Sequence, residues 1–199
     1  MFKLNRENLP HYFYYSKKLI FSKWFTFWAG ISASWWYIKI GSSCRFLGRP
    51  HFYRYPESRI EIGPNCRFNS LPTSNLLGIN RPCIISSLKP EAIIKIGENC
   101  GFSGTTIGCA LNITLGNNVR CGANTTITDT DWHFDDERSG LDAPVNIGNN
   151  VWLGANVIVL KGVTIGENTI VGAGSIVSRS LPSDVVAVGS PAKVVKELH

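Results

Sequence analysis

One short stretch of the chain contains the residue types that general base catalysis needs. The stretch "DTDWH", Asp129–His133, sets a histidine among carboxylates. Histidine titrates near neutral pH, so its imidazole takes a proton from a hydroxyl group readily. A carboxylate bonded to the second ring nitrogen would fix the tautomer and stabilise the imidazolium. Asp131 and Asp129 are the nearest candidates, and in an extended segment the alternation would place both on the same side as His133. We therefore expect His133 to be the catalytic base.

This stretch interrupts a repeat of six residues. Downstream of it, aliphatic residues recur at every sixth position: Ile147, Leu153, Val159, Ile165, Val171 and Val177. Upstream, Leu115, Cys121 and Ile127 follow the same period. Ile127 and Ile147 are twenty positions apart, which is not a multiple of six, so at least part of 128–144 must leave the repeat as a loop. Loops that protrude from a rigid scaffold commonly carry functional residues.

The period of six predicts a parallel β-helix. It fits neither a helix of 3.6 residues per turn nor a hairpin series, and it is typical of hexapeptide repeats, in which each unit supplies one short strand and one corner. Three units make a triangular coil, and stacked coils bury their aliphatic residues in continuous columns. We expect this prism to run from about Ile38 to about Pro182, with less regular coils at its N-terminal end. The tail beyond it is predicted to be an exit loop followed by a short helix or strand.

Composition limits the remaining possibilities. The chain has 199 residues, 20 Lys+Arg and 14 Asp+Glu, and a net charge of +6, which suggests one domain with affinity for anionic ligands or a membrane surface. No long basic run or zinc-finger spacing supports nucleic-acid binding. Six cysteines form no C-x-x-C pair, so no metal site is expected. The recurring "IGSSC", "IGPNC" and "IGENC" predict buried, reduced wall residues, as in a cytoplasmic protein.

Residues 1–37 form an N-terminal segment of different character. The stretch Lys17–Ile40 contains most of the tryptophans, and lysines and serines interrupt it, so a full membrane span is not expected. A helix that lies on a membrane surface is one interpretation. Packing of the aromatic residues on the protein itself or on a neighbouring subunit is the other. No cleavable signal peptide is expected, because the small-residue cleavage site is missing.

Residues 38–197 resemble the hexapeptide-repeat acyltransferases. The run "IGNNVWLGANVIVLKGVTIGENTIVGAGSIVSRSLPSDVVAVGSPAKVVKEL" is similar to the acetyl-coenzyme A half of sugar O-acetyltransferases of the maltose and galactoside type, and "DTDWH" looks more like the subgroup that modifies surface polysaccharides. The resemblance implies an all-β fold, a left-handed parallel β-helix with a short N-terminal helical segment and a short C-terminal element. It also implies a homotrimer with active sites between subunits and acetyl-coenzyme A as co-substrate.

The resemblance also implies which residues bind the two substrates. Small residues at Gly154, Ala155 and Ala173 would admit the pantetheine arm, and Trp152 would pack beside it. Lys193, together with Arg179 and Lys161, would pair with coenzyme phosphates. On the acceptor side, Ser103 is a candidate for the place of a helper asparagine in the maltose-type enzymes, with Thr105 or a backbone amide as alternatives. Trp132 is a second candidate for acceptor binding.

These features together predict an O-acetyltransferase that acts on a sugar hydroxyl during surface-polysaccharide or lipopolysaccharide assembly, at the inner face of a bacterial membrane. Its acceptor would be a sugar or a lipid-linked glycan. The alternatives are a non-catalytic trimeric scaffold, since fold alone does not imply function, and a zinc carbonic anhydrase of the β-helix type. The anhydrase requires several histidine ligands, whereas the repeat region offers His133 and His51. A serine acetyltransferase would need a larger helical N-terminal domain.

Overall fold

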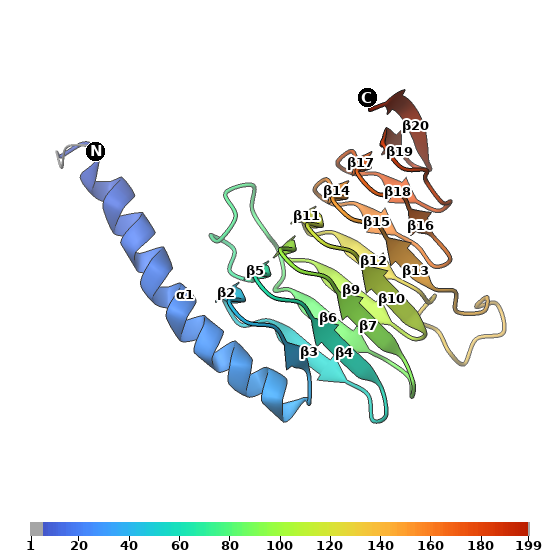
Figure 1. Ribbon diagram of the computed structural model, residues 1–199, viewed down its shortest axis with the longest axis horizontal. Coiled ribbons are helices and arrows are strands. Elements are labelled where there is room, and N and C mark those ends of the chain that lie inside the picture. The colour runs from blue at the N-terminus through green and yellow to red at the C-terminus, as the bar shows by residue number, and fades with distance from the viewer. Residues whose placement is uncertain (1–5, 199) are drawn as a thin grey trace.

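The protein consists of one long helix followed by a prism of short strands (Figure 1). The computed structural model describes residues 6–198, and over this range it contains α1 (Leu9–Trp35) and twenty strands in three sheets. Pro10 stands in the first turn of α1, where its missing N–H group costs no intrahelical hydrogen bond. The helix ends before Ile38, and the first strand starts at Lys39.

The three sheets form the sides of the prism. We call them sheets A, B and C, in the order in which the chain first reaches them. Sheet A contains β1 (Lys39–Ile40), β4 (Arg59–Ile62), β7 (Ile93–Ile96), β10 (Asn112–Leu115), β13 (Val145–Ile147) and β16 (Thr164–Ile165). Sheet B contains β2 (Arg45–Leu47), β5 (Arg67–Asn69), β8 (Gly101–Ser103), β11 (Arg120–Ala123), β14 (Trp152–Leu153), β17 (Ile170–Val171), β19 (Val185–Gly189) and β20 (Ala192–Glu197). Sheet C contains β3 (His51–Arg54), β6 (Ile84–Ser87), β9 (Thr106–Cys109), β12 (Thr126–Thr128), β15 (Ile158–Val159) and β18 (Ile176–Val177).

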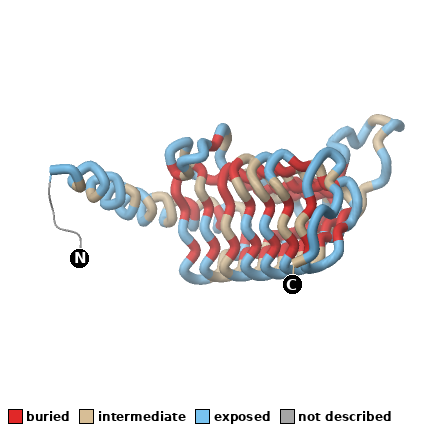
Figure 2. The backbone as a smooth tube through the Cα atoms, turned by 90° about the horizontal axis from the view of Figure 1, so that it is seen from above, coloured by how far each residue is buried: buried red, intermediate tan, exposed pale blue. Residues whose placement is uncertain are grey.

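Stacking of like residues in successive coils builds the core. Each strand pairs in parallel with the equivalent strand one coil away, so that Leu115 lies beside Ile147 and Leu153 beside Val171. Buried and exposed residues alternate along the coils, as the stripes in Figure 2 show. Burying one such aliphatic side chain contributes about 1.5–3 kcal/mol. The predicted parallel β-helix is therefore confirmed, and its period of six holds without interruption from Ile147 to Val177.

Two long insertions disturb the coils that precede Ile147. Residues 129–144 leave between β12 and β13, at the corner where sheet C gives way to sheet A. Residues 70–83 leave between β5 and β6 at the corner between sheets B and C. They pack on α1, because Tyr14 Oη donates to Thr73 O at 3.0 Å and Lys18 Nζ to Ser74 O at 3.1 Å.

The interior of the N-terminal coils is lined by aromatic rings and thiols. Phe46, Phe68 and Phe102 stack on consecutive strands of sheet B, with ring centroids 4.8 and 4.9 Å apart. All six cysteines are free and buried, which confirms that they are wall residues. Burial raises the pKa of the Cys83 and Cys121 thiols, so these groups stay protonated and weakly reactive.

The two ends of the prism are covered differently. At the first coil, α1 packs against β1 and β2 through Ala29 and Ala33, and Thr26 Oγ1 accepts from Phe46 N at 3.0 Å. At the last coil, β20 pairs antiparallel with β19, so the tail is a strand and not a helix. Along residues 6–198, no helix combines the length and the apolar character that crossing a membrane would take.

Candidate active site

Asp129 anchors the start of the 129–144 loop. Its side chain is fully buried, and it lies directly after β12. Oδ1 accepts from Ala110 N at 2.6 Å, and Oδ2 accepts from Leu111 N at 2.8 Å and from Asn112 N at 2.7 Å. Those amides belong to the corner between β9 and β10, one coil earlier. The carboxylate thus satisfies three main-chain donors, one of them buried and two part-buried, at the turn into β10.

Asp131 holds the middle of the loop to the next coil. Its Oδ2 lies 2.5 Å from Lys161 Nζ and accepts from Gly140 N at 3.1 Å. The hydrogen bond from Lys161 holds the pKa of Asp131 below its usual value. Lys161, a residue expected to bind a coenzyme phosphate, is therefore already paired with this carboxylate.

A second ion pair closes the far end of the loop. Lys89 Nζ lies 2.5 Å from Asp142 Oδ2. The backbone continues this closure, because Ala143 N donates to Asp129 O at 3.0 Å and Gly162 N donates to Ala143 O at 2.9 Å. Both ends of the loop are thus fixed to the prism, while the residues between them project outward (Figure 2).

His133 lies in the exposed part of this loop. It borders a hollow of about 170 Å³ whose other walls are Lys89, Thr130, Phe134, Asp136, Ser139, Gly140, Leu141 and Asp142. Within the described residues, its imidazole makes no hydrogen bond to Asp129 or Asp131. The expectation that the alternation of "DTDWH" would place the three side chains on one side is wrong. The chain bends after β12, and Trp132 has a φ of 69°, so the segment is not extended.

Trp132 folds back from the loop onto the outer face of sheet C. Its ring occupies the space that a side chain at position 108 would need, since a Cβ built on Gly108 would lie 2.2 Å from the ring. Gly108, in β9, therefore makes room for this tryptophan. The indole remains 43 % exposed, so one face is open to a ligand.

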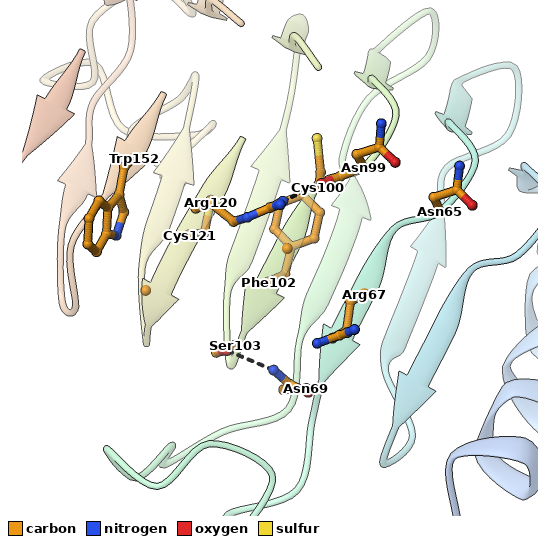
Figure 3. A pocket seen from close by; sticks show the side chains of 12 residues that line it. Asn65, Arg67, Asn69, Asn99, Cys100, Phe102, Ser103, Arg120, Cys121 and Trp152 are labelled. Atoms are coloured by element: carbon orange, nitrogen blue, oxygen red, sulfur yellow. Dashed lines mark hydrogen bonds between the residues drawn. The ribbon is translucent and has the colours of Figure 1, made fainter. Parts of the chain in front are cut away.

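A second and larger hollow lies on sheet B. It measures about 370 Å³, and its lining includes Ser103, Arg67, Arg120, Asn69 and Trp152. Figure 3 shows Arg120 between Trp152 on one side and Arg67 on the other, and the hydrogen bond from Asn69 Nδ2 to Ser103 Oγ, which is 3.1 Å long. Asn69 Oδ1 is buried and accepts no hydrogen bond within the described residues. The hollow thus offers two guanidinium groups and an aromatic wall.

The residues expected to bind the coenzyme lie on the regular C-terminal coils. Trp152 stands on the outer face of sheet B, and Gly154, Ala155 and Ala173 form the corner that follows. A Cβ on Gly154 would lie 2.6 Å from Ala173 N, so the stacking of the coils by itself requires glycine there. Lys193 lies exposed on β20 at the end of the same sheet, whereas Arg179 lies just past sheet C.

The two hollows lie on opposite sides of the prism. The loop that carries His133 leaves the corner between sheets C and A, and sheet B is the side of the triangle that faces away from that corner. His133, Asp131 and Trp132 are therefore on one side, and Ser103 and Trp152 are on the other. Within one chain the structure does not bring these two groups together.

The arginines of the sheet B hollow were missed by sequence reasoning. Arg67 belongs to "NCRF", which repeats the pattern of "SCRF" at Ser43–Phe46. The residue between the buried cysteine and the buried phenylalanine must point outward, so this repeat was the available signal. Among residues 6–198, no group of three His, Cys, Asp or Glu side chains is arranged to hold a metal ion.

Comparison with known proteins gives a relationship in sequence. Residues 144–179 match the family described as bacterial transferase hexapeptide (six repeats). The chain is 42 % identical over 91 residues to the galactoside O-acetyltransferase of Escherichia coli, a match that covers 44 % of this chain and 45 % of that protein. It is 43 % identical over 109 residues to the galactoside O-acetyltransferase of Lactococcus lactis, covering 48 % and 52 %. The chain thus spans about half the length of these curated relatives.

Solved structures give a relationship in fold. A variant of the N-acyltransferase AntD from Bacillus cereus, in complex with dTDP-4-amino-4,6-dideoxyglucose and coenzyme A, superimposes with a TM-score of 0.62 at 21 % identity, over 81 % of this chain and 84 % of that one. A galactoside acetyltransferase in complex with coenzyme A gives 0.50 at 28 % identity, over 80 % and 65 %. These neighbours are left-handed β-helices. The chain thus carries the bacterial transferase hexapeptide repeat over residues 144–179 and shares the β-helix fold of these solved structures.

Proposed function

We propose that the protein is an O-acetyltransferase that moves an acetyl group from acetyl-coenzyme A to a sugar hydroxyl. The observation that carries the proposal is His133, set on a loop whose two ends are fixed to an otherwise regular prism by Asp129, Asp131 and Asp142. The similarity to galactoside O-acetyltransferases supports the reaction class. The bound coenzyme A in the galactoside acetyltransferase structure supports the donor.

In the proposed reaction His133 acts as a general base in a direct transfer. The imidazole removes the proton of the sugar hydroxyl while its oxygen attacks the thioester carbonyl carbon. The tetrahedral intermediate collapses, the carbon–sulfur bond breaks, and the thiolate takes the proton back from the imidazolium, which yields the acetyl ester and free coenzyme A. Asp129 and Asp131 are positioning residues in this scheme, since they hold the loop and do not touch the ring.

The donor is assigned to the C-terminal coils. Trp152, Gly154, Ala155 and Ala173 would border the pantetheine arm, where small residues permit close approach to main-chain groups. Lys193 and Arg179 would pair with the phosphates as charge-assisted donors. Lys161 is left out of this set, because Asp131 already neutralises it.

The active site is proposed to form between subunits of a homotrimer. His133 and the sheet B hollow lie on opposite sides of one prism, so a loop from one copy has to reach sheet B of the next copy for them to act together. Ser103 and Trp132 would then contact the acceptor from two different chains. This requirement supports a trimer, which is typical of the resembled family.

The acceptor is proposed to be a sugar of a surface polysaccharide or lipopolysaccharide precursor, modified at the inner face of a bacterial membrane. Support comes from α1, which carries Lys17, Lys18 and Lys23, no acidic residue, and many exposed aromatic side chains. Such a composition favours the interface of an anionic membrane.

The test compares the wild type with two variants in acetyl-coenzyme A binding and in acetyl transfer to the surface glycan. His133→Ala should lower transfer by a factor of about 10²–10⁴, while acetyl-coenzyme A still raises the melting temperature. His51→Ala is the matched control, because His51 is an exposed histidine on β3, remote from the loop. Mass spectrometry of the glycan measures the acetyl content.

Two results would overturn the proposal. Unchanged transfer by His133→Ala would remove the histidine from the mechanism. Failure of acetyl-coenzyme A to stabilise the wild-type protein, together with unchanged glycan acetylation when the gene is deleted, would favour the non-catalytic scaffold.

A further inference from the structure

Beyond the hollow at Trp152, the outer face of sheet B continues as a groove toward the helix. We call the hollow at Trp152 the first hollow. A second hollow, of about 550 Å³, lies between α1 and this sheet and shares Arg67 and Asn69 with the first. A third, of about 450 Å³, lies on the first turns of α1 and shares Ser16 with the second. The first two hollows are thus neighbours on sheet B, and the third adjoins the second along α1 at Ser16.

The middle of this groove is positively charged and has no counter-ion. Arg45 and Arg67 are direct partners on neighbouring parallel strands, so their side chains leave the sheet about 4.8 Å apart. Among residues 6–198, no side chain forms an ion pair or hydrogen bond with either guanidinium group, and no acidic residue lines the first or second hollow. Like charges directly opposite each other destabilise a sheet. An anion bound between Arg45 and Arg67 would relieve this repulsion.

Sheet A shows what a neutralised arrangement looks like. There Lys39 and Arg59 flank Glu61, whose carboxylate lies 3.2 Å from Lys39 Nζ and 3.9 Å from Arg59 Nε. The equivalent outward positions of sheet B hold Arg45, Arg67 and Arg120, with Gly101 between the last two. Sheet B thus carries a row of cations that sheet A avoids.

The character of the groove changes along its length. The hollow on the first turns of α1 is lined by Leu9, Pro10, Tyr12, Phe13 and Ser16, which are mostly apolar. The second adds Leu19 and Leu47 next to Lys18, Arg45 and Arg67. The first hollow, at the other end of the groove, is lined by asparagine side chains, the Ser103 hydroxyl and Trp152. An apolar end, a cationic middle and a polar end match a molecule with a hydrocarbon tail, a phosphate group and a sugar.

From this gradient we infer that the groove binds the acceptor as a lipid-linked sugar phosphate or diphosphate. Its tail would lie against α1, its phosphates would bind at Arg45 and Arg67, and its sugar would lie toward Ser103 and Trp152. Bidentate contacts from guanidinium groups suit phosphate oxygens. This inference rests on the proposed acetyl transfer and specifies the class of its acceptor.

Binding of three soluble probes to the full-length protein tests the inference. Farnesyl diphosphate below its micellar concentration carries both tail and charge, inorganic diphosphate carries only the charge, and farnesol carries only the tail. Isothermal titration calorimetry should show farnesyl diphosphate binding at least tenfold more tightly than either other probe. UDP tests the alternative that the diphosphate belongs to a nucleotide sugar, and equal or tighter binding of UDP would overturn the lipid-linked assignment.

Variants locate the binding. Arg67→Gln should weaken farnesyl diphosphate binding about tenfold and leave the melting temperature without ligand unchanged or slightly raised, because a repulsive pair is removed. Leu19→Ser should weaken the binding of farnesyl diphosphate but not the binding of inorganic diphosphate. Arg59→Gln on sheet A is the matched control, and it should change the affinity for neither farnesyl diphosphate nor inorganic diphosphate. Equal affinity of wild type and Arg67→Gln for farnesyl diphosphate would overturn the inference.

The same experiment separates this inference from the proposed function. Stabilisation by acetyl-coenzyme A is measured in parallel on the same samples. If acetyl-coenzyme A binds and farnesyl diphosphate does not, the acceptor assignment alone is wrong. If acetyl-coenzyme A also fails to bind, the acetyltransferase proposal is wrong as well.

Discussion

The prism has a regular half and an interrupted half, and the two are built for different purposes. From Ile147 to Val177, each coil repeats the one before it, and its core is an aliphatic column. From Lys39 to Thr128, coils differ in length, loops leave at two corners, and the core contains three stacked phenylalanines. The exposed loop with His133 and the unpaired arginines belong to the interrupted half. Departures from the repeat therefore mark His133 and the unpaired arginines, whereas the residues proposed to bind the coenzyme lie on the regular coils.

The largest effect on stability is expected at the junction of the two halves. Asp129→Ala leaves the N–H groups of Ala110, Leu111 and Asn112 without their acceptor, at about 1–3 kcal/mol for each unsatisfied buried group. We expect a loss of about 5 kcal/mol in the free energy of unfolding, together with loss of transfer. Chemical denaturation measures the first, and Asp129→Asn, which retains one acceptor oxygen, should lose less. A loss below about 1 kcal/mol would contradict the anchoring role.

A substitution within the regular half should separate stability from activity. Ile165 is fully buried between Ile147 and Leu181 on sheet A, away from the residues proposed to bind either substrate. Ile165→Ala should cost about 2–5 kcal/mol through the lost apolar contacts and the cavity left behind. Transfer per folded molecule, measured well below the melting temperature, should stay within about twofold of wild type. A larger loss of transfer would show that the regular coils influence the site directly.

A substitution that keeps the fold but moves the loop should lower transfer and leave stability almost unchanged. The Cβ of Gly108→Ala would overlap the Trp132 ring, so the tryptophan and the adjacent His133 must shift. Displacing a catalytic group by about 1 Å costs roughly a hundredfold in rate, whereas the melting temperature should change by only a few degrees. Gly108→Ala combined with Trp132→Ala removes the overlap, so the double variant should regain the loop position in a crystal structure. Unchanged transfer in the single variant would mean that Trp132 does not position the loop.

The smallest effect is expected from the exposed ion pair. Because Lys161 lowers the pKa of Asp131 in the folded protein, the pair stabilises the fold above the ordinary carboxyl pKa of about 4, and this contribution is lost as the pH falls through the lower folded value. Asp131 is 45 % exposed, so Asp131→Asn should cost less than about 1 kcal/mol near neutral pH. The difference in melting temperature between the two proteins should disappear at acid pH. A difference that grows there would reverse the assigned sign.

The six-residue spacing predicted the architecture because each repeat unit is a short, continuous stretch of the sequence. The spacing of Ile147, Leu153 and Val159 was enough for the fold class, and the count between Ile127 and Ile147 located the loop that carries His133. The orientation of Asp129 could not be predicted, because its partners at Ala110–Asn112 lie on another coil, about twenty positions earlier. Similarly, the cationic row became visible only when Arg45, Arg67 and Arg120 came together on one sheet.

The two covered ends of the prism have a consequence for the state of the protein in solution. A stack of parallel coils presents unpaired N–H and C=O groups at its first and last rungs, which are templates for joining further chains. α1 covers the first rung through Ala29, Ala33 and Thr26, and the antiparallel strand β20 closes one side of the last. The helix thus shields the first rungs of β1 and β2, and we expect a variant that lacks α1 to associate end to end through these exposed strands.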